Sequence, residues 1–159
     1  MTIAARLTEL GITIPPKRGP MANYVSAVTT GNLVFLSGHG PYREDGSMIT
    51  GRLGADLTIE QGYEAARATV LACLASLKEE IGSLDRVTRF VKLLGMVNAT
   101  ESFVDAPRVI NGASDLLVEI FGEKGRHARS AVGMQSLPSN IAVEIEMIVE
   151  IAPQKGSGR

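Results

Sequence analysis

Residues 141–151 read IAVEIEMIVEI, and this stretch decides the fold class. Apolar side chains occupy every odd-numbered position, whereas Glu144, Glu146 and Glu150 occupy even-numbered positions. Successive side chains of a β-strand point to opposite faces of a sheet. The alternation therefore predicts a strand with one face in the hydrophobic core and with three carboxylates on the other face.

The rest of the chain alternates between strand-like and helix-like patterns. We expect one long helix that begins at Thr58, where Thr58 and Gln61 resemble a capping box, and ends at Gly82. A second helix is expected over residues 109–121, followed by Gly122, and a short one over residues 3–11. The further strands are expected at 24–29, 33–36, 48–53, 87–97 and 130–134.

The resulting order is β-β-β-α-β-α-β-β, which predicts an α+β fold with a mixed sheet and two helices on one face. The other face has no helices to cover it, and burial against copies of the same chain would produce an oligomer. The chain is expected to form a single domain over residues 1–159. Residues 1–20 precede the first hairpin, and residues 152–159 are expected to be a flexible tail.

The composition is that of an ordinary globular protein, with 45% hydrophobic and 21% charged residues. The net charge is −1 and Trp is absent, so neither a basic surface nor many stacking rings point to a nucleic acid. The single cysteine, Cys73, allows no disulfide within the chain and fits a reducing compartment. Without a membrane-spanning apolar run or a secretory signal, we expect a cytoplasmic protein.

Arg129 is the first candidate for a functional side chain. On a strand it shares a face with Ala131 and Gly133, and these small neighbours leave room for a ligand. A guanidinium binds a carboxylate through two parallel hydrogen bonds and stays charged at any working pH. The alternative is an exposed arginine or a structural ion pair, and the residue pattern leaves both open.

Two further patterns suggest polar chemistry. Glu144 and Glu146 lie about 6.6 Å apart along one strand face, and one of them could act as a general base for a water molecule. The alternative is a solvated polar face. In residues 37–40 (SGHG), the glycines let backbone N–H groups approach an oxyanion or a water. The end of a hairpin explains that segment equally well.

Other chemistries find little support in the sequence. His39 and His127 are the only histidines and are not at metal-ligand spacing, so we expect no metal site. No serine lies in a G-x-S-x-G elbow, which argues against a serine nucleophile. Cys73 falls on the apolar stripe of the long helix and is expected in the core. Asn111, near the start of the second helix, could bond a ligand or neighbouring backbone.

Several segments together resemble the RidA/YjgF family, which is also labelled the L-PSP endoribonuclease family. Residues 128–132 (ARSAV), 137–138 (LP) and 143–146 (VEIE) resemble its C-terminal signature in order and spacing. Upstream, residues 24–25 (YV) and 31–38 (GNLVFLSG) resemble its first hairpin. The resemblance extends from about residue 20 to residue 151.

This resemblance implies a chorismate-mutase-like fold and a homotrimer with clefts between the subunits. It also implies the hydrolytic deamination of small 2-imino or enamino acids to 2-keto acids and ammonia, without a metal or cofactor. Arg129 would hold the substrate carboxylate, and Glu144 would help to place the attacking water. The other positions expected to line the cleft are Tyr24, Ser37, Gly38, Asn111 and Ala131.

The sequence departs from common members of the family in ways that concern the substrate. Ala131 stands where many relatives have a cysteine, which excludes a thiol nucleophile there. A longer segment between Leu93 and Asn111, and the residues before the hairpin, can both reshape the rim of the cleft. Two other functions remain open. One is a non-catalytic module that binds a small carboxylate, and the other is an endoribonuclease or translation inhibitor, which the near-neutral charge disfavours.

Overall fold

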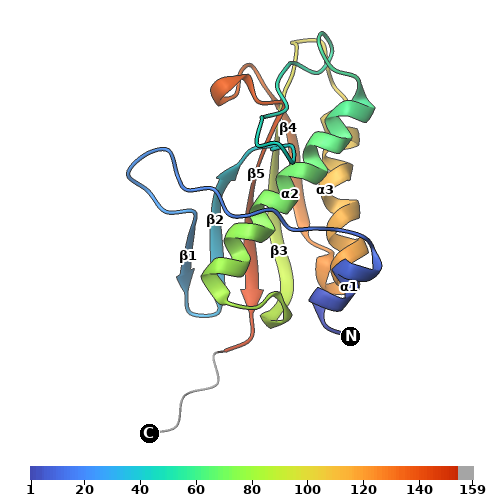
Figure 1. Cartoon of the computed structure of the whole chain (residues 1–159). Helices are drawn as coiled ribbons and strands as arrows, with labels where there is room; N and C mark the ends of the chain where they lie inside the picture. Colours follow the sequence, from blue (N-terminus) through green and yellow to red (C-terminus); the bar gives the residue numbers. More distant parts are fainter. Residues whose placement is uncertain (154–159) are drawn as a thin grey trace, which may run out of the picture.

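The computed structural model describes residues 1–153 and consists of a five-stranded sheet with two long helices on one face (Figure 1). The predicted α+β fold is confirmed, whereas most of the expected tail, 152–159, lies outside the described residues. The helices are α1 (Ile3–Glu9), α2 (Ile59–Ile81) and α3 (Ala106–Phe121), with short 3₁₀ turns η1 (Leu84–Arg86), η2 (Gly122–Gly125) and η3 (Pro138–Asn140). The strands are β1 (Ala27–Thr30), β2 (Leu33–His39), β3 (Val87–Asn98), β4 (Ala128–Met134) and β5 (Val143–Ile151).

The strand that decides the fold class lies at the centre of the sheet. The strand order is β1-β2-β5-β3-β4, in which β3 and β4 run parallel and all other neighbours run antiparallel. The odd-numbered apolar residues of β5 are buried, and the even-numbered residues are more exposed. The predicted alternation is therefore confirmed, and it places the three glutamates on the face that the helices leave open.

The open face of the sheet also carries apolar side chains. Phe35 is paired with Val28 of β1 on one side and with Ile148 of β5 on the other. Val28 and Phe35 are both classed as exposed, as is Val132 on β4. An exposed group of large apolar side chains marks an interaction surface more often than a solvated one.

The long helix has the predicted ends. The Thr58 hydroxyl accepts a hydrogen bond from the Gln61 backbone, and the Gln61 side chain accepts one from the Thr58 backbone, which completes the capping box. Gly82 ends the helix with a φ of 81°. Helices α2 and α3 approach closely at Gly112, where a Cβ atom would overlap the backbone carbonyl of Tyr63.

The predicted third strand at residues 48–53 is wrong. This segment makes only isolated bridges, which join Met48 to Tyr42, Thr50 to Ile141, and Leu53 to Leu57 and Ala99. Its path is bent by Gly51, whose φ of 124° does not belong to an extended strand. Two neighbouring predictions also shift, because β1 begins at Ala27, after the expected start at residue 24, and β2 continues through residues 37–39 instead of ending at 36.

Residues 1–20 are packed against the helix layer. Helix α1 lies against α3, where the Arg6 guanidinium donates to the backbone carbonyl of Glu119 at 3.1 Å. The chain then crosses α2 (Figure 1), and Lys17 forms an ion pair with Glu79 of that helix at 2.6 Å. This path brings the segment that follows Lys17 to the end of β2.

Cys73 should be chemically inert as long as the protein is folded. Its side chain is fully buried on α2, and burial raises the pKa of the thiol far above its usual range. Since the thiolate is the reactive form, we expect no reaction with a thiol reagent in native buffer and one equivalent of reaction in denaturant. Measurable labelling of the native protein before unfolding would contradict this placement.

The described residues contain neither a group of potential metal ligands nor a helix that could span a membrane. Within residues 1–153, no three His, Cys, Asp or Glu side chains group together as metal ligands would. In the same part of the chain, every helix is too short or too polar to cross a membrane.

Candidate functional site

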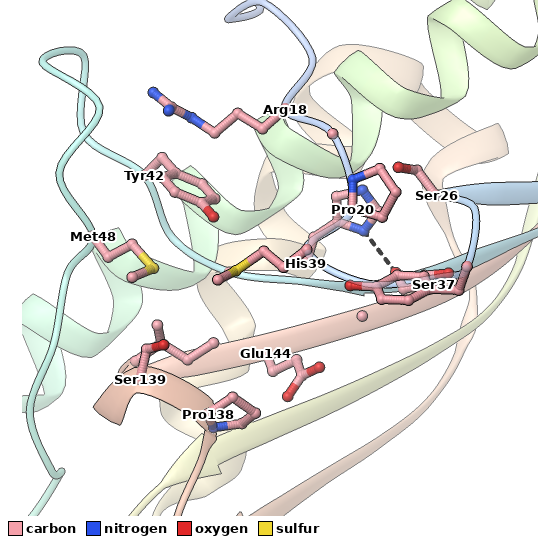
Figure 2. Close-up of a pocket in the computed structure, with 16 residues that line it drawn as sticks. Arg18, Pro20, Ser26, Ser37, His39, Tyr42, Met48, Pro138, Ser139 and Glu144 are labelled. Atoms are coloured by element: carbon pink, nitrogen blue, oxygen red, sulfur yellow. Dashed lines mark hydrogen bonds between the residues drawn. The ribbon is translucent and has the colours of Figure 1, made fainter.

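A pocket of about 160 Å³ opens beside β5, at the end of β2 (Figure 2). It brings together four of the predicted site residues, namely Tyr24, Ser37, Gly38 and Glu144. Tyr24, Ser37 and Gly38 come from the first hairpin and the segment before it, whereas Glu144 comes from β5, more than 100 residues later. The residues of its walls that the sequence analysis did not assign to a site include Arg18, Met21, Tyr42, Met48, Ser139 and Ile141.

A β-bulge at Ser37 and Gly38 shapes the floor of this pocket. Leu36 is paired with Met147, but His39 is paired with Ile145, so β2 has one more residue than β5 between these pairs. The extra residue lets both Leu36 and His39 face the helices. The bulge lies against Glu144, and a Cβ atom on Gly38 would overlap the Glu144 carboxylate. Glycine at position 38 is therefore what allows the carboxylate to lie directly over the backbone.

The Glu144 carboxyl has an unusual electrostatic environment. It is half-buried, and burial raises the pKa of Glu144, with a further increase from the negative charge of Glu146 on the same strand face. A carboxyl group with a raised pKa holds a proton more strongly than an ordinary surface glutamate. Such a group is suited to take a proton from a water molecule at near-neutral pH and to return it later.

His39 attaches the bulge to the helix layer. Its Nδ1 lies 2.6 Å from the carbonyl oxygen of Ser37, and its Nε2 lies 2.7 Å from the hydroxyl of Ser76 on α2. Figure 2 shows the dashed bond from the His39 ring toward Ser37. Burial is the main cause that lowers the pKa of His39. The ring is therefore predominantly neutral at pH 7, and its two bonds fix the segment that contacts Glu144.

The segment that follows Lys17 forms the outer wall of the pocket. The Arg18 guanidinium lies 4.4 Å from the ring centre of Tyr42, in a cation–π contact. Met21 and Met48 add two flexible apolar side chains to the same walls. The residues before the first hairpin therefore take part in the rim of the pocket.

Arg129 lies on the opposite face of the sheet from Glu144. It is paired with Leu93, which is buried under the helices, and its Nη1 donates to the Asn111 amide oxygen at 3.0 Å and to the Ser114 hydroxyl at 3.1 Å. Its Nη2 makes a longer contact of 3.5 Å with the carbonyl of Pro107. Over residues 1–153 no carboxylate forms an ion pair with Arg129. The alternative that Arg129 belongs to a structural ion pair is therefore wrong.

The structure thus assembles the predicted residues into two separate groups. Tyr24, Ser37, Gly38 and Glu144 share the pocket at the end of β2. Asn111 and Arg129 meet on the helix side of the edge strand β4, and Ala131 follows on the same face of that strand. Within one chain, the side chains of Arg129 and Glu144 therefore cannot both contact the same small ligand.

Sequence reasoning missed the residues that hold these two groups in place. Ser76 and Ser114 lie on the two long helices, and each bonds a histidine whose other nitrogen bonds a backbone carbonyl two residues earlier. No spacing in the sequence relates Ser76 to His39, because helix packing brings them together. Gly38 was expected to line the cleft, but the sequence analysis did not predict the bulge in which it lies.

The comparisons with known proteins agree with the fold. A family described as "YjgF/chorismate_mutase-like, putative endoribonuclease" matches residues 4–151, which includes most of residues 1–20. Protein TCP17 of Trypanosoma cruzi is 46% identical over 150 residues, which cover 94% of each chain. The 2-iminobutanoate/2-iminopropanoate deaminase of Dermatophagoides farinae is 31% identical over 141 residues, which cover 88% of this chain and 94% of that protein.

A solved structure extends this agreement to three dimensions. The protein Atu1372 of Agrobacterium tumefaciens, described as having unknown function, superposes with a TM-score of 0.87 at 43% identity, and the match covers 95% of this chain and 94% of that one. The sequence match and the superposition therefore cover nearly the same residues. On this basis the chain belongs to the YjgF/chorismate-mutase-like family, as its resemblance to RidA/YjgF proteins predicted.

Proposed function

We propose that this protein hydrolyses small 2-imino or enamino acids to 2-keto acids and ammonia, without a metal or cofactor. The observation that carries the proposal is the Glu144 carboxyl, which lies over Gly38 in a pocket and whose pKa is raised by burial and by Glu146. The relative from Dermatophagoides farinae, named as a deaminase of this kind, supports the same reaction.

The reaction needs a positioned water and a fixed substrate. A protonated imine is already electrophilic at C2, so the protein has to orient it and to supply the nucleophile. Glu144 accepts a proton as the water oxygen forms its bond to C2. That proton then goes to the nitrogen, and the C–N bond breaks so that ammonia leaves. As the C2 carbonyl forms, the remaining hydroxyl proton passes to Glu144, which releases it to the departing ammonia or to solvent. Arg129 binds the carboxylate throughout.

The placement of Arg129 and Glu144 supports a site shared between subunits. The two side chains face opposite sides of one sheet, so a substrate that touches both needs Arg129 of one copy and Glu144 of another. We propose a homotrimer with three such clefts. The apolar side chains on the open face of the sheet, among them Phe35 and Val28, would lie in the contact between the copies.

An imine-trapping assay tests the proposed function. An amino-acid oxidase produces imino acids from single amino acids in the presence of semicarbazide, which traps them as semicarbazones. The wild-type protein should lower the yield of semicarbazone and raise the yield of 2-keto acid and ammonia. If no imine from a panel of small amino acids is consumed faster than in buffer alone, the proposed activity is wrong.

The rate should depend on pH through Glu144. As a base, Glu144 must be deprotonated, so kcat should fall as the pH drops through its raised pKa. Glu146→Gln removes a neighbouring negative charge and therefore lowers the pKa of Glu144. We expect the acidic limb of the kcat–pH profile to move to lower pH in this variant.

The matched control for this measurement is Glu150→Gln, which changes the same residue type farther along β5. Glu150 accepts a hydrogen bond from Thr88 and does not affect the pKa of Glu144. Its profile should match that of the wild type. An acidic limb that stays in place in Glu146→Gln would show that another group controls the rate.

The non-catalytic alternative uses the same arginine. A module that only binds a small carboxylate requires Arg129 but not Glu144, so it predicts that a 2-keto acid binds without any imine being consumed. The endoribonuclease named in the family description requires a surface that attracts RNA, whereas the net charge of this chain is −1. Cleavage of RNA by the purified protein, lost on substitution of Arg129, would favour that function.

A further inference from the structure

Arg129 is joined by hydrogen bonds to a histidine that the proposed reaction does not use. Its Nη1 donates to the hydroxyl of Ser114 on α3 at 3.1 Å. The same hydroxyl lies 2.9 Å from Nε2 of His127, and Nδ1 of His127 lies 2.7 Å from the carbonyl oxygen of Gly125. A continuous chain of three hydrogen bonds thus connects η2, α3 and β4.

The direction of these bonds follows from the group at each end. The Gly125 carbonyl can only accept, so Nδ1 of His127 carries the proton, and Nε2 of the neutral ring is then an acceptor. Ser114 must therefore donate its hydroxyl hydrogen to Nε2. This leaves its oxygen lone pairs free to accept from Arg129, which has only donors to offer. A neutral His127 thus makes Ser114 an acceptor for the guanidinium.

The remaining contacts decide which part of Arg129 can bind a ligand. Asn111 accepts from Nη1 at 3.0 Å, so Ser114 and Asn111 together occupy both N–H groups of that nitrogen. Nη2 makes only the 3.5 Å contact with Pro107, and Nε has no acceptor within the part of the chain that the structure describes. The edge formed by Nε and Nη2 is therefore left for the two oxygens of a carboxylate.

We propose that Ser114 and His127 are positioning residues that hold Arg129 so that its Nε–Nη2 edge receives the substrate carboxylate. The inference rests on the proposed function in one respect, since it takes Arg129 as the group that binds the carboxylate. Neither residue touches the substrate, and each acts through Arg129. An arginine that is already held in one orientation loses less conformational entropy when its ligand binds.

The surroundings of His127 favour the neutral ring that this arrangement requires. Burial lowers the pKa of His127, the bond to the Gly125 carbonyl opposes this effect, and the charge of Arg129 lowers it further. A carboxylate bound to Arg129 would offset that charge and so raise the pKa of His127. The other charged side chains on α3, on η2 and directly before His127 are Arg108, Asp115, Glu119, Glu123, Lys124 and Arg126.

Substitutions at these positions separate positioning from stability. Ser114→Ala should raise KM for the imine and the dissociation constant for pyruvate about tenfold, while kcat at saturation stays close to the wild-type value. His127→Leu, which leaves the Ser114 hydroxyl without its acceptor, should do the same. Ser114→Thr keeps a hydroxyl and His127→Gln supplies an acceptor oxygen, so both should recover most of the affinity.

NMR titration of the His127 ring in the full-length protein gives a readout that does not depend on turnover. Ser114→Ala removes the donor to Nε2, and Arg129→Ala removes the nearby positive charge, so each should raise the pKa of His127. Pyruvate should raise it in the wild type but not in Arg129→Ala. The control is Ser76→Ala, which removes the equivalent hydroxyl beside His39 and should leave the His127 titration unchanged.

The outcomes for the proposed function and for this inference are distinct. A wild type that consumes no imine overturns the proposed function, while the pyruvate affinity and the His127 titration still decide the inference. The inference is wrong if Ser114→Ala leaves both KM and pyruvate affinity unchanged. It is also wrong if the pKa of His127 in Ser114→Ala stays at its wild-type value, because the Ser114 hydroxyl would then not donate to Nε2.

Discussion

Arg129→Ala is expected to lower kcat/KM for imino acids on the order of 100- to 1000-fold, because the substrate carboxylate loses its charged, bidentate partner. The loss should appear mainly as a higher KM, and pyruvate should bind correspondingly more weakly. Asn111 and Ser114 would keep their places on α3, so circular dichroism and the oligomeric state should be unaffected. The comparison is made by initial rates in the imine assay over a range of substrate concentrations.

Arg126→Ala is the matched control for this variant. Arg126 lies three residues earlier, is exposed, and forms an ion pair with Glu123 at 3.0 Å. Its removal takes away the same charge from the same region and should leave KM unchanged. Arg129→Lys should fall between the wild type and Arg129→Ala, because lysine keeps the charge but not the planar fork. Wild-type kinetics for Arg129→Ala would refute the assignment of the carboxylate site.

Glu144→Gln should lower kcat on the order of 100- to 10,000-fold, the usual contribution of a general base, with a much smaller change in KM. Glutamine has nearly the same shape and fits over Gly38, but it cannot take the proton of the attacking water. The acidic limb of the pH profile should disappear along with the activity. Rapid-quench or continuous measurement of ammonia release at saturating imine gives kcat directly.

Glu150→Gln again serves as the control, since it changes a carboxylate of the same strand face outside the pocket. If Glu144→Gln binds pyruvate normally but the wild type itself shows no turnover, the non-catalytic binding module becomes the better description. If Glu144→Gln keeps the wild-type kcat, the water must be activated by another group.

Mixing the two variants tests whether the site is shared between copies. Arg129→Ala subunits retain Glu144, and Glu144→Gln subunits retain Arg129. When the two are unfolded together and refolded into mixed oligomers, some clefts should contain both intact residues and regain activity. Recovery in the mixture, absent from each variant refolded alone, is expected for an inter-subunit cleft. No recovery in oligomers shown to be mixed would contradict it.

The sequence by itself determined the secondary structure where local patterns are strong. The alternation in residues 141–151 specified the central strand and its two faces, because side-chain direction in a strand depends only on position. The capping box at Thr58 and the glycine at position 82 set the ends of α2. The segment at 48–53 misled because its apolar residues resemble a strand, whereas the positive φ of Gly51 interrupts the extended backbone and leaves only isolated bridges.

The sequence also marked Arg129, Glu144 and Gly38, since their residue types and resemblance to the family are local features. Only the tertiary structure decided that Arg129 and Glu144 face opposite sides of the sheet, because that depends on strand order and register. It alone paired Ser76 with His39 and Ser114 with His127, through helix packing that no sequence spacing encodes. Local periodicity thus specified the elements, and long-range packing specified which side chains could act together.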